Sequence, residues 1–125
     1  MEMNHRVASS CVMVLLLALG GCSTTTDLRS QMPEREFTSK KSAKDFSGCV
    51  ADGLERVFPR GIQGRPTSKG YAVTKDDNIV GWGTHSAFAA DFEDQPNGGS
   101  VVKTYFAWDQ SSVKSRYLRV VDDCK

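Results

Sequence analysis

The chain lacks the motifs of the common catalytic and cofactor-binding sites. No serine stands in the nucleophile-elbow sequence of the α/β-hydrolases. The glycines at 81–83 are not followed by the third glycine of a dinucleotide-binding loop, and residues 61–65 lack the lysine of a P-loop. Only two histidines occur in the 125 residues. These absences predict a protein without a cofactor, and they favour a non-enzymatic function.

A long hydrophobic run and a strong net charge are absent as well. The most apolar stretch, residues 7–19, is shorter than the roughly 20 residues that a membrane-spanning helix needs. The formal net charge is +1 at pH 7, whereas nucleic-acid-binding domains usually carry a clear excess of basic residues. We therefore expect no nucleic-acid partner.

The N-terminus carries one specific pattern. A short polar start is followed by the apolar stretch 7–19, whose length suits the hydrophobic region of a secretory signal. Residues 19–22 (LGGC) then give an aliphatic residue, two small residues and a cysteine, Cys22. This order resembles the signal peptide and lipobox of a bacterial lipoprotein. The alternatives are an ordinary signal peptide with a structural Cys22, or a buried N-terminal helix.

The resemblance implies a lipid anchor and a location. In this family residues 1–21 are removed, and the cysteine, here Cys22, carries a diacylglycerol thioether and usually an acylated amine. One acyl chain binds a membrane only marginally, but two or three together hold a protein there stably. Ser23 is not the aspartate that retains such proteins in the inner membrane. The resemblance thus implies the outer membrane of a Gram-negative bacterium, with the domain in the periplasm, and the mature chain resembles the small single-domain lipoproteins of that envelope in size and layout.

The remaining cysteines are expected to form a disulfide. Cys11 leaves with the signal and Cys22 is acylated, so Cys49 and Cys124 remain as an even pair in an oxidising compartment. Their bond would close a loop of about 75 residues, which the chain-entropy model values at roughly 4.5 kcal/mol. Two free buried thiols are the alternative. Two cysteines and one distant histidine are too few ligands for a metal site.

Composition divides the mature chain at about residue 41. Residues 22–41 are rich in serine, threonine and charge and hold few large apolar residues, a composition that favours disorder. We expect a flexible tether there, with a root-mean-square reach of roughly 25 Å. A short helix over 27–37 that docks on the domain is the alternative. Residues 42–125 are expected to form a single periplasmic domain.

Periodicity and turn signals predict an α+β fold for this domain. Ser42 and Asp45 form a capping-box pattern, and apolar or small residues then recur at helical spacing, with Cys49 on the buried stripe, until Pro59 ends the helix. Apolar spacing over 113–124 favours a second helix, with a strand as the alternative. Strands are expected at 70–75, 79–83, 85–92 and 100–108, with a turn at 76–78 and loops at 59–70 and 94–99. The expected fold is a small antiparallel sheet of three or four strands, with one or two helices packed on one face and one disulfide.

Two groups of side chains are candidates for binding. Arg60, Arg65 and Lys69 belong to a basic, glycine- and proline-rich loop that would contact phosphate headgroups, peptidoglycan carboxylates or an acidic protein. A merely solvated loop is the alternative. Trp82 and Tyr105 would belong to an exposed binding surface if one face of the sheet is bare, ordinary packing being the alternative.

His85 and an acidic cluster offer two further possibilities. His85 is the one histidine left after processing. With a nearby serine or carboxylate it would serve a small periplasmic hydrolase, and otherwise it is a solvated or strand-edge histidine. Asp91, Glu93 and Asp94 are expected to be exposed solubilising charges, or to bind a cation weakly.

These patterns together predict a function in the cell envelope. The expected protein is a lipid-anchored outer-membrane lipoprotein, held in the membrane through the acyl chains on Cys22. Its non-enzymatic periplasmic domain is expected to bind another envelope component, either a protein or the peptidoglycan. A hydrolase using His85 is the alternative, and a structural envelope protein without a specific ligand is a third possibility.

Overall fold

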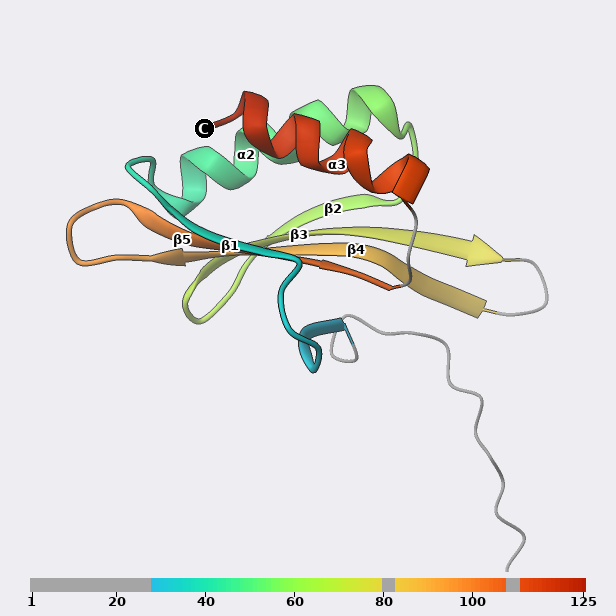
Figure 1. Ribbon diagram of the computed structural model, residues 1–125, viewed down its shortest axis with the longest axis horizontal. Coiled ribbons are helices and arrows are strands. Elements are labelled where there is room, and N and C mark those ends of the chain that lie inside the picture. Colours follow the sequence, from blue (N-terminus) through green and yellow to red (C-terminus); the bar gives the residue numbers. More distant parts are fainter. Residues whose placement is uncertain (1–27, 80–82, 108–110) are drawn as a thin grey trace, which may run out of the picture.

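The computed structural model describes residues 28–79, 83–107 and 111–125. Within them a five-stranded antiparallel sheet carries two helices on one face (Figure 1). The elements in chain order are β1 (Arg35–Ser39), α2 (Ala43–Val57), β2 (Ile62–Pro66), β3 (Gly70–Ile79), β4 (Gly83–Asp94), β5 (Ser100–Phe106) and α3 (Ser111–Asp123). The order across the sheet is β1-β5-β4-β3-β2. The predicted α+β class is confirmed, although the sheet has five strands rather than three or four.

Helix α2 forms where the sequence predicts it. Its N-cap is Ser42, whose Oγ accepts a hydrogen bond from the Asp45 N–H at 3.2 Å. At the other end the Phe58 N–H donates to the Leu54 carbonyl at 2.7 Å, and the proline at the next position prevents the helix from continuing. The side chains that α2 buries recur at helical spacing and are Ala43, Phe46, Ser47, Val50 and Leu54.

Helix α3 confirms the predicted final helix and lies beside α2 (Figure 1). The expected disulfide joins the two helices, with the Cα atoms of Cys49 and Cys124 5.8 Å apart. Cys124 is buried but Cys49 is exposed, so the prediction that Cys49 lies on the buried stripe is wrong. The disulfide places Cys49 on the flank of α2 that faces α3 rather than the sheet. The helices also approach closely at Gly53, where a Cβ would lie 2.6 Å from Val120 Cγ1.

The main core lies between the helix layer and one face of the sheet. Its centre is an aromatic group in which Tyr117 of α3 stacks on Phe58 and on Phe88 of β4, with ring centroids 4.5 and 4.7 Å away. Phe106 of β5 meets the Tyr117 ring edge-on at 5.6 Å. Tyr117 is 2 % exposed, and this burial raises the pKa of its phenol to about 12.

Two strands form where the sequence predicted none. Strand β1 occupies part of the expected tether 22–41, and β2 occupies the middle of the expected loop 59–70. Both are edge strands, and each turns only one large apolar side chain, Phe37 or Ile62, toward the core. The tether prediction is therefore wrong from residue 28 onward, while residues 22–27 lie outside the described part of the chain.

The predicted turn at 76–78 is also wrong, because β3 continues through it to Ile79. The pairing of β3 with β4 shifts register between Lys75 and Asp76, as at a β-bulge. Asp76 accepts a hydrogen bond from the Ser86 hydroxyl at 2.8 Å, and Asp77 pairs with the Lys75 ammonium. These partners satisfy the carboxylates within the strand, where the sequence pattern alone indicated a turn.

Candidate functional site

One row of register partners crosses the face of the sheet that turns away from the helices. The row runs Arg65–Ala72–Asp91–Lys103–Glu36 from β2 across to β1. On β1, β3, β4 and β5 this row has at least one strand neighbour that packs in the core, and on β2 a Cβ at Gly64 would lie 3.8 Å from Ala51 of α2. Alternation therefore turns the row itself away from the helices. We call the surface around this row the open face.

The N-terminal segment of the described chain lies against the open face (Figure 1). Leu28 is 1 % exposed and packs on Ala89 and Tyr105 in a second, smaller hydrophobic cluster. Next to Leu28, the Arg29 guanidinium donates hydrogen bonds to the Asp91 carboxylate. Arg29 Nε lies 3.0 Å from Oδ1 and 2.8 Å from Oδ2, and Nη2 lies 2.7 Å from Oδ1. These hydrogen bonds raise the pKa of Arg29. An apolar contact and an ion pair thus hold the segment on the sheet.

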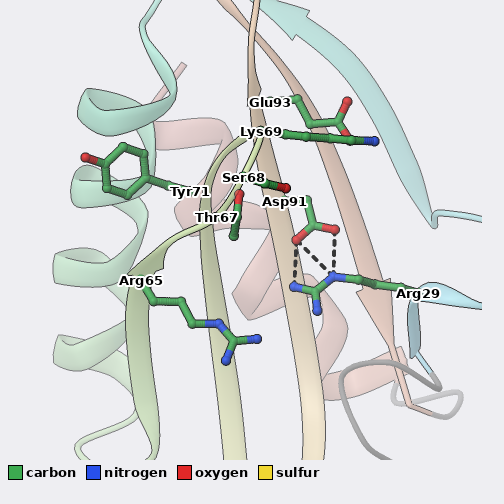
Figure 2. A pocket seen from close by; sticks show the side chains of 8 residues that line it. All are labelled: Arg29, Arg65, Thr67, Ser68, Lys69, Tyr71, Asp91 and Glu93. Atoms are coloured by element: carbon green, nitrogen blue, oxygen red, sulfur yellow. Dashed lines mark hydrogen bonds and ion pairs between the residues drawn. The ribbon is translucent and has the colours of Figure 1, made fainter.

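A pocket of about 290 Å³ opens on the open face beside this segment (Figure 2). Arg29 and Arg65 point into it from opposite sides with Asp91 between them, whereas Tyr71 points away (Figure 2). The residues that line the pocket are Arg29, Arg65, Thr67, Ser68, Lys69, Tyr71, Asp91 and Glu93. We call this the basic pocket.

The turn between β2 and β3, residues 67–69, supplies one wall of the basic pocket. The Thr67 N–H donates to the Gly70 carbonyl at 2.9 Å, and the Gly70 N–H donates to Thr67 Oγ1 at 3.1 Å. The Lys69 carbonyl accepts a hydrogen bond from the Asp94 N–H at 2.9 Å. A Cβ at Gly70 would lie 2.1 Å from the Phe92 carbonyl oxygen, so glycine allows the turn to pack this closely on β4.

The charges of the basic pocket are unevenly matched. The two carboxylates are already paired, Asp91 with Arg29 and Glu93 with Lys103 at 3.3 Å. The hydrogen bond from Lys103 to Glu93 raises the pKa of that ammonium. Arg65 and Lys69 are both exposed and have no ion-pair partner within the described ranges. The pocket therefore presents two cations whose charge no carboxylate offsets at contact distance.

The structure brings together two of the three predicted basic residues. Arg65 and Lys69 line the basic pocket, but Arg60 precedes β2 while Lys69 follows it. Five strand residues separate them, and a strand advances about 3.4 Å per residue. The expected cationic loop is thus a strand and a turn, with Arg60 at the far end.

For Tyr105 the structure shows ordinary packing rather than an exposed binding surface. Its side chain is on the open face, as expected, but it is only 7 % exposed because Leu28 covers it. This burial raises the pKa of Tyr105. Trp82, like Cys22, lies outside the described residues.

The predicted acidic cluster is likewise divided among separate partners. Asp91 pairs with Arg29, Glu93 pairs with Lys103, and Asp94 accepts a hydrogen bond from the Ala43 N–H at 3.3 Å. Within the described ranges, no group of three or more histidine, cysteine or acidic side chains is placed to hold a metal ion. The three acids therefore contact three different parts of the fold: the N-terminal segment, the neighbouring strand β5 and the start of α2.

His85 is half-buried in β4 and stands opposite Asp77 of β3 in the register. Among the residues that the structure describes, no hydrogen bond links His85 to a serine. The basic pocket is lined by other side chains and does not include His85.

Sequence reasoning missed Arg29 and Asp91 as members of the site. Arg29 stands in a segment whose composition indicates disorder, and its partner is 62 residues away in the chain. A weak signal is present, since Asp91 interrupts an otherwise apolar stretch between Ala90 and Phe92. An acid in the middle of a strand of this kind indicates a partner from elsewhere in the chain.

Comparison with known proteins adds no relative: no family model, curated protein or solved structure matches this chain. None of the helices within 28–79, 83–107 and 111–125 combines the length and the hydropathy of a membrane-spanning helix.

Proposed function

We propose that the protein is a lipoprotein of the outer membrane, anchored through Cys22, and that its periplasmic domain binds another envelope component through the open face. The observation that carries this proposal is the docking of Leu28 and Arg29 on that face. The segment that leads back to Cys22 therefore meets the domain on the same face of the sheet that holds the basic pocket.

The length of chain between Cys22 and the domain supports an orientation in which the open face is the side nearer the membrane. Cys22 is six residues before Leu28, and a fully extended chain spans at most about 3.5 Å per residue. The acylated cysteine therefore lies within about 20 Å of the docked Leu28. Because Leu28 is on the open face and the helices cover the opposite one, the open face is the side nearer the lipid.

The first test concerns the anchor. Replacement Cys22→Ser should abolish metabolic labelling by palmitate and release the protein from the membrane fraction. The control is Ser23→Ala, which leaves the cysteine in place and should remain labelled and membrane-bound. Unchanged labelling and retention of Cys22→Ser would refute the lipid anchor.

The second test concerns the binding face. A photo-crosslinking amino acid at Gln63 would stand on the open face, since its strand neighbours Ile62 and Gly64 face the core and α2. The matched position is Glu55, which is exposed on α2. We expect crosslinks to one envelope component from Gln63 in intact cells, identified by mass spectrometry, and none of that component from Glu55. Equal crosslinking from both positions would contradict a specific open-face partner.

A further inference from the structure

We propose that the basic pocket binds the phosphate group of an anionic phospholipid headgroup. The proposal deepens the function proposed above, because the membrane comes within reach of the pocket only if Cys22 is acylated. Its size fits a small group: pockets for whole drug-sized ligands measure roughly 300–1,000 Å³, and this one measures about 290 Å³.

The charge of the pocket selects an anion. Arg65 and Lys69 are exposed at its rim and have no carboxylate partner within the described ranges. Asp91 and Glu93 do not reverse this balance, because Arg29 and Lys103 already neutralise them. A guanidinium offers planar paired donors to a phosphate, and an ammonium adds a point charge.

The β2–β3 turn adds hydroxyl donors to these cations. Thr67 Oγ1 accepts the hydrogen bond from the Gly70 N–H, so its own hydroxyl proton remains available to a ligand oxygen. Ser68 stands next to it on the same turn and also lines the pocket (Figure 2). A tetrahedral oxyanion can accept from several such donors at once, whereas a neutral headgroup lacks the charge that Arg65 and Lys69 favour.

The position of the pocket selects a lipid as the source of the phosphate. Arg29 lines the pocket and directly follows Leu28, so the pocket begins at the residue where the chain from the anchor meets the domain. The chain from Cys22 spans at most about 20 Å, which keeps the pocket close to the headgroups. Arg65 and Lys69 therefore meet a high local concentration of phosphate at the membrane surface.

The experiment uses the full-length acylated protein with two double variants of equal charge. Arg65→Gln with Lys69→Gln removes the cations of the pocket. Arg116→Gln with Arg119→Gln removes two exposed cations of α3, on the other side of the molecule. The acylation of Cys22 is checked by mass spectrometry in each sample, which separates a failure of the anchor from a failure of the pocket.

In the first arm the protein in neutral detergent is titrated with inorganic phosphate, with chloride as the control for ionic strength. We expect saturable binding by the wild type and by the α3 variant, and a loss of affinity of about tenfold or more in the pocket variant. Absence of binding, or an equal loss in both variants, would overturn the proposal.

In the second arm the acylated protein is placed in vesicles of phosphatidylcholine with and without phosphatidylglycerol. We expect phosphatidylglycerol to slow amide hydrogen exchange over residues 65–71 in the wild type and the α3 variant, but not in the pocket variant. If inorganic phosphate binds in the first arm but vesicle composition leaves exchange unchanged, a free anion is the ligand and the lipid proposal is overturned.

Discussion

Alanine substitution at two glycines of α2 tests how closely the helix layer is packed. Gly53→Ala would place a Cβ 2.6 Å from Val120 Cγ1, whereas Gly48→Ala meets no atom within 4 Å. Both changes gain about 1 kcal/mol of helix propensity. Carbon atoms normally lie about 3.5–4.0 Å apart, and the β-branched Val120 has little rotamer freedom with which to yield.

The overlap at Gly53 sets the size of the expected difference. Overpacking between closely packed elements costs about 1–3 kcal/mol, which offsets or exceeds the propensity gain. We expect Gly48→Ala to raise the free energy of unfolding by about 1 kcal/mol, and Gly53→Ala to leave it unchanged or lower it by up to about 2 kcal/mol. Urea unfolding followed by circular dichroism, with the disulfide intact, measures both. Equal stabilisation by the two variants would refute the close approach of α2 and α3.

Three other predictions concern stability. Replacing Cys49 and Cys124 together by alanine should lower the free energy of unfolding by roughly 4 kcal/mol, because their bond closes a 75-residue separation; a change below about 1 kcal/mol in chemical denaturation would contradict this role. Thr104→Val should stabilise the fold by about 1 kcal/mol, since its buried hydroxyl has no partner in the described part of the chain; a measured loss of stability would show that the hydroxyl is satisfied. The pKa of Tyr117 is raised to about 12 in the folded protein. The stabilisation of the fold by the protonated phenol is therefore complete below pH about 10 and is lost as the pH rises toward 12. The total loss in the free energy of unfolding is about 2–3 kcal/mol. Tyr117→Phe should flatten this alkaline decline in unfolding free energy, and an unchanged pH profile would count against the burial of the phenol.

The elements that the sequence predicts well are those with strong local patterns. Helix α2 has its cap at Ser42 and a buried stripe within 15 residues, and β5 at Ser100–Phe106 is rich in β-branched and aromatic residues. Strands β1 and β2 carry one large inward apolar residue each, Phe37 and Ile62. They form because β5 and β3 supply the pairing, and non-local pairing of this kind leaves little trace in a short window of sequence.

In the candidate site, too, the residues with a local sequence pattern are predicted and those that depend on non-local contacts are not. Arg65 and Lys69 are predicted because a concentration of basic residues is visible in the sequence itself. The pairing of Arg29 with Asp91 is not, because it depends on how a polar segment crosses the sheet. The docking of Leu28 and Arg29 also shortens the expected tether of about 20 residues, so under the proposed function a much shorter link would join the domain to the lipid.

A measurement of how the domain is oriented on the membrane most directly tests the proposal that the open face lies nearer the lipid. A donor fluorophore is attached at Gln63→Cys on the open face or at Glu55→Cys on α2, in acylated protein held in vesicles with an acceptor-labelled lipid. Both positions are exposed, and the chain from Cys22 limits the distance of Leu28 from the proposed anchor to about 20 Å. We expect clearly more efficient energy transfer from Gln63 than from Glu55. Equal transfer, or stronger transfer from Glu55, would contradict the proposed orientation.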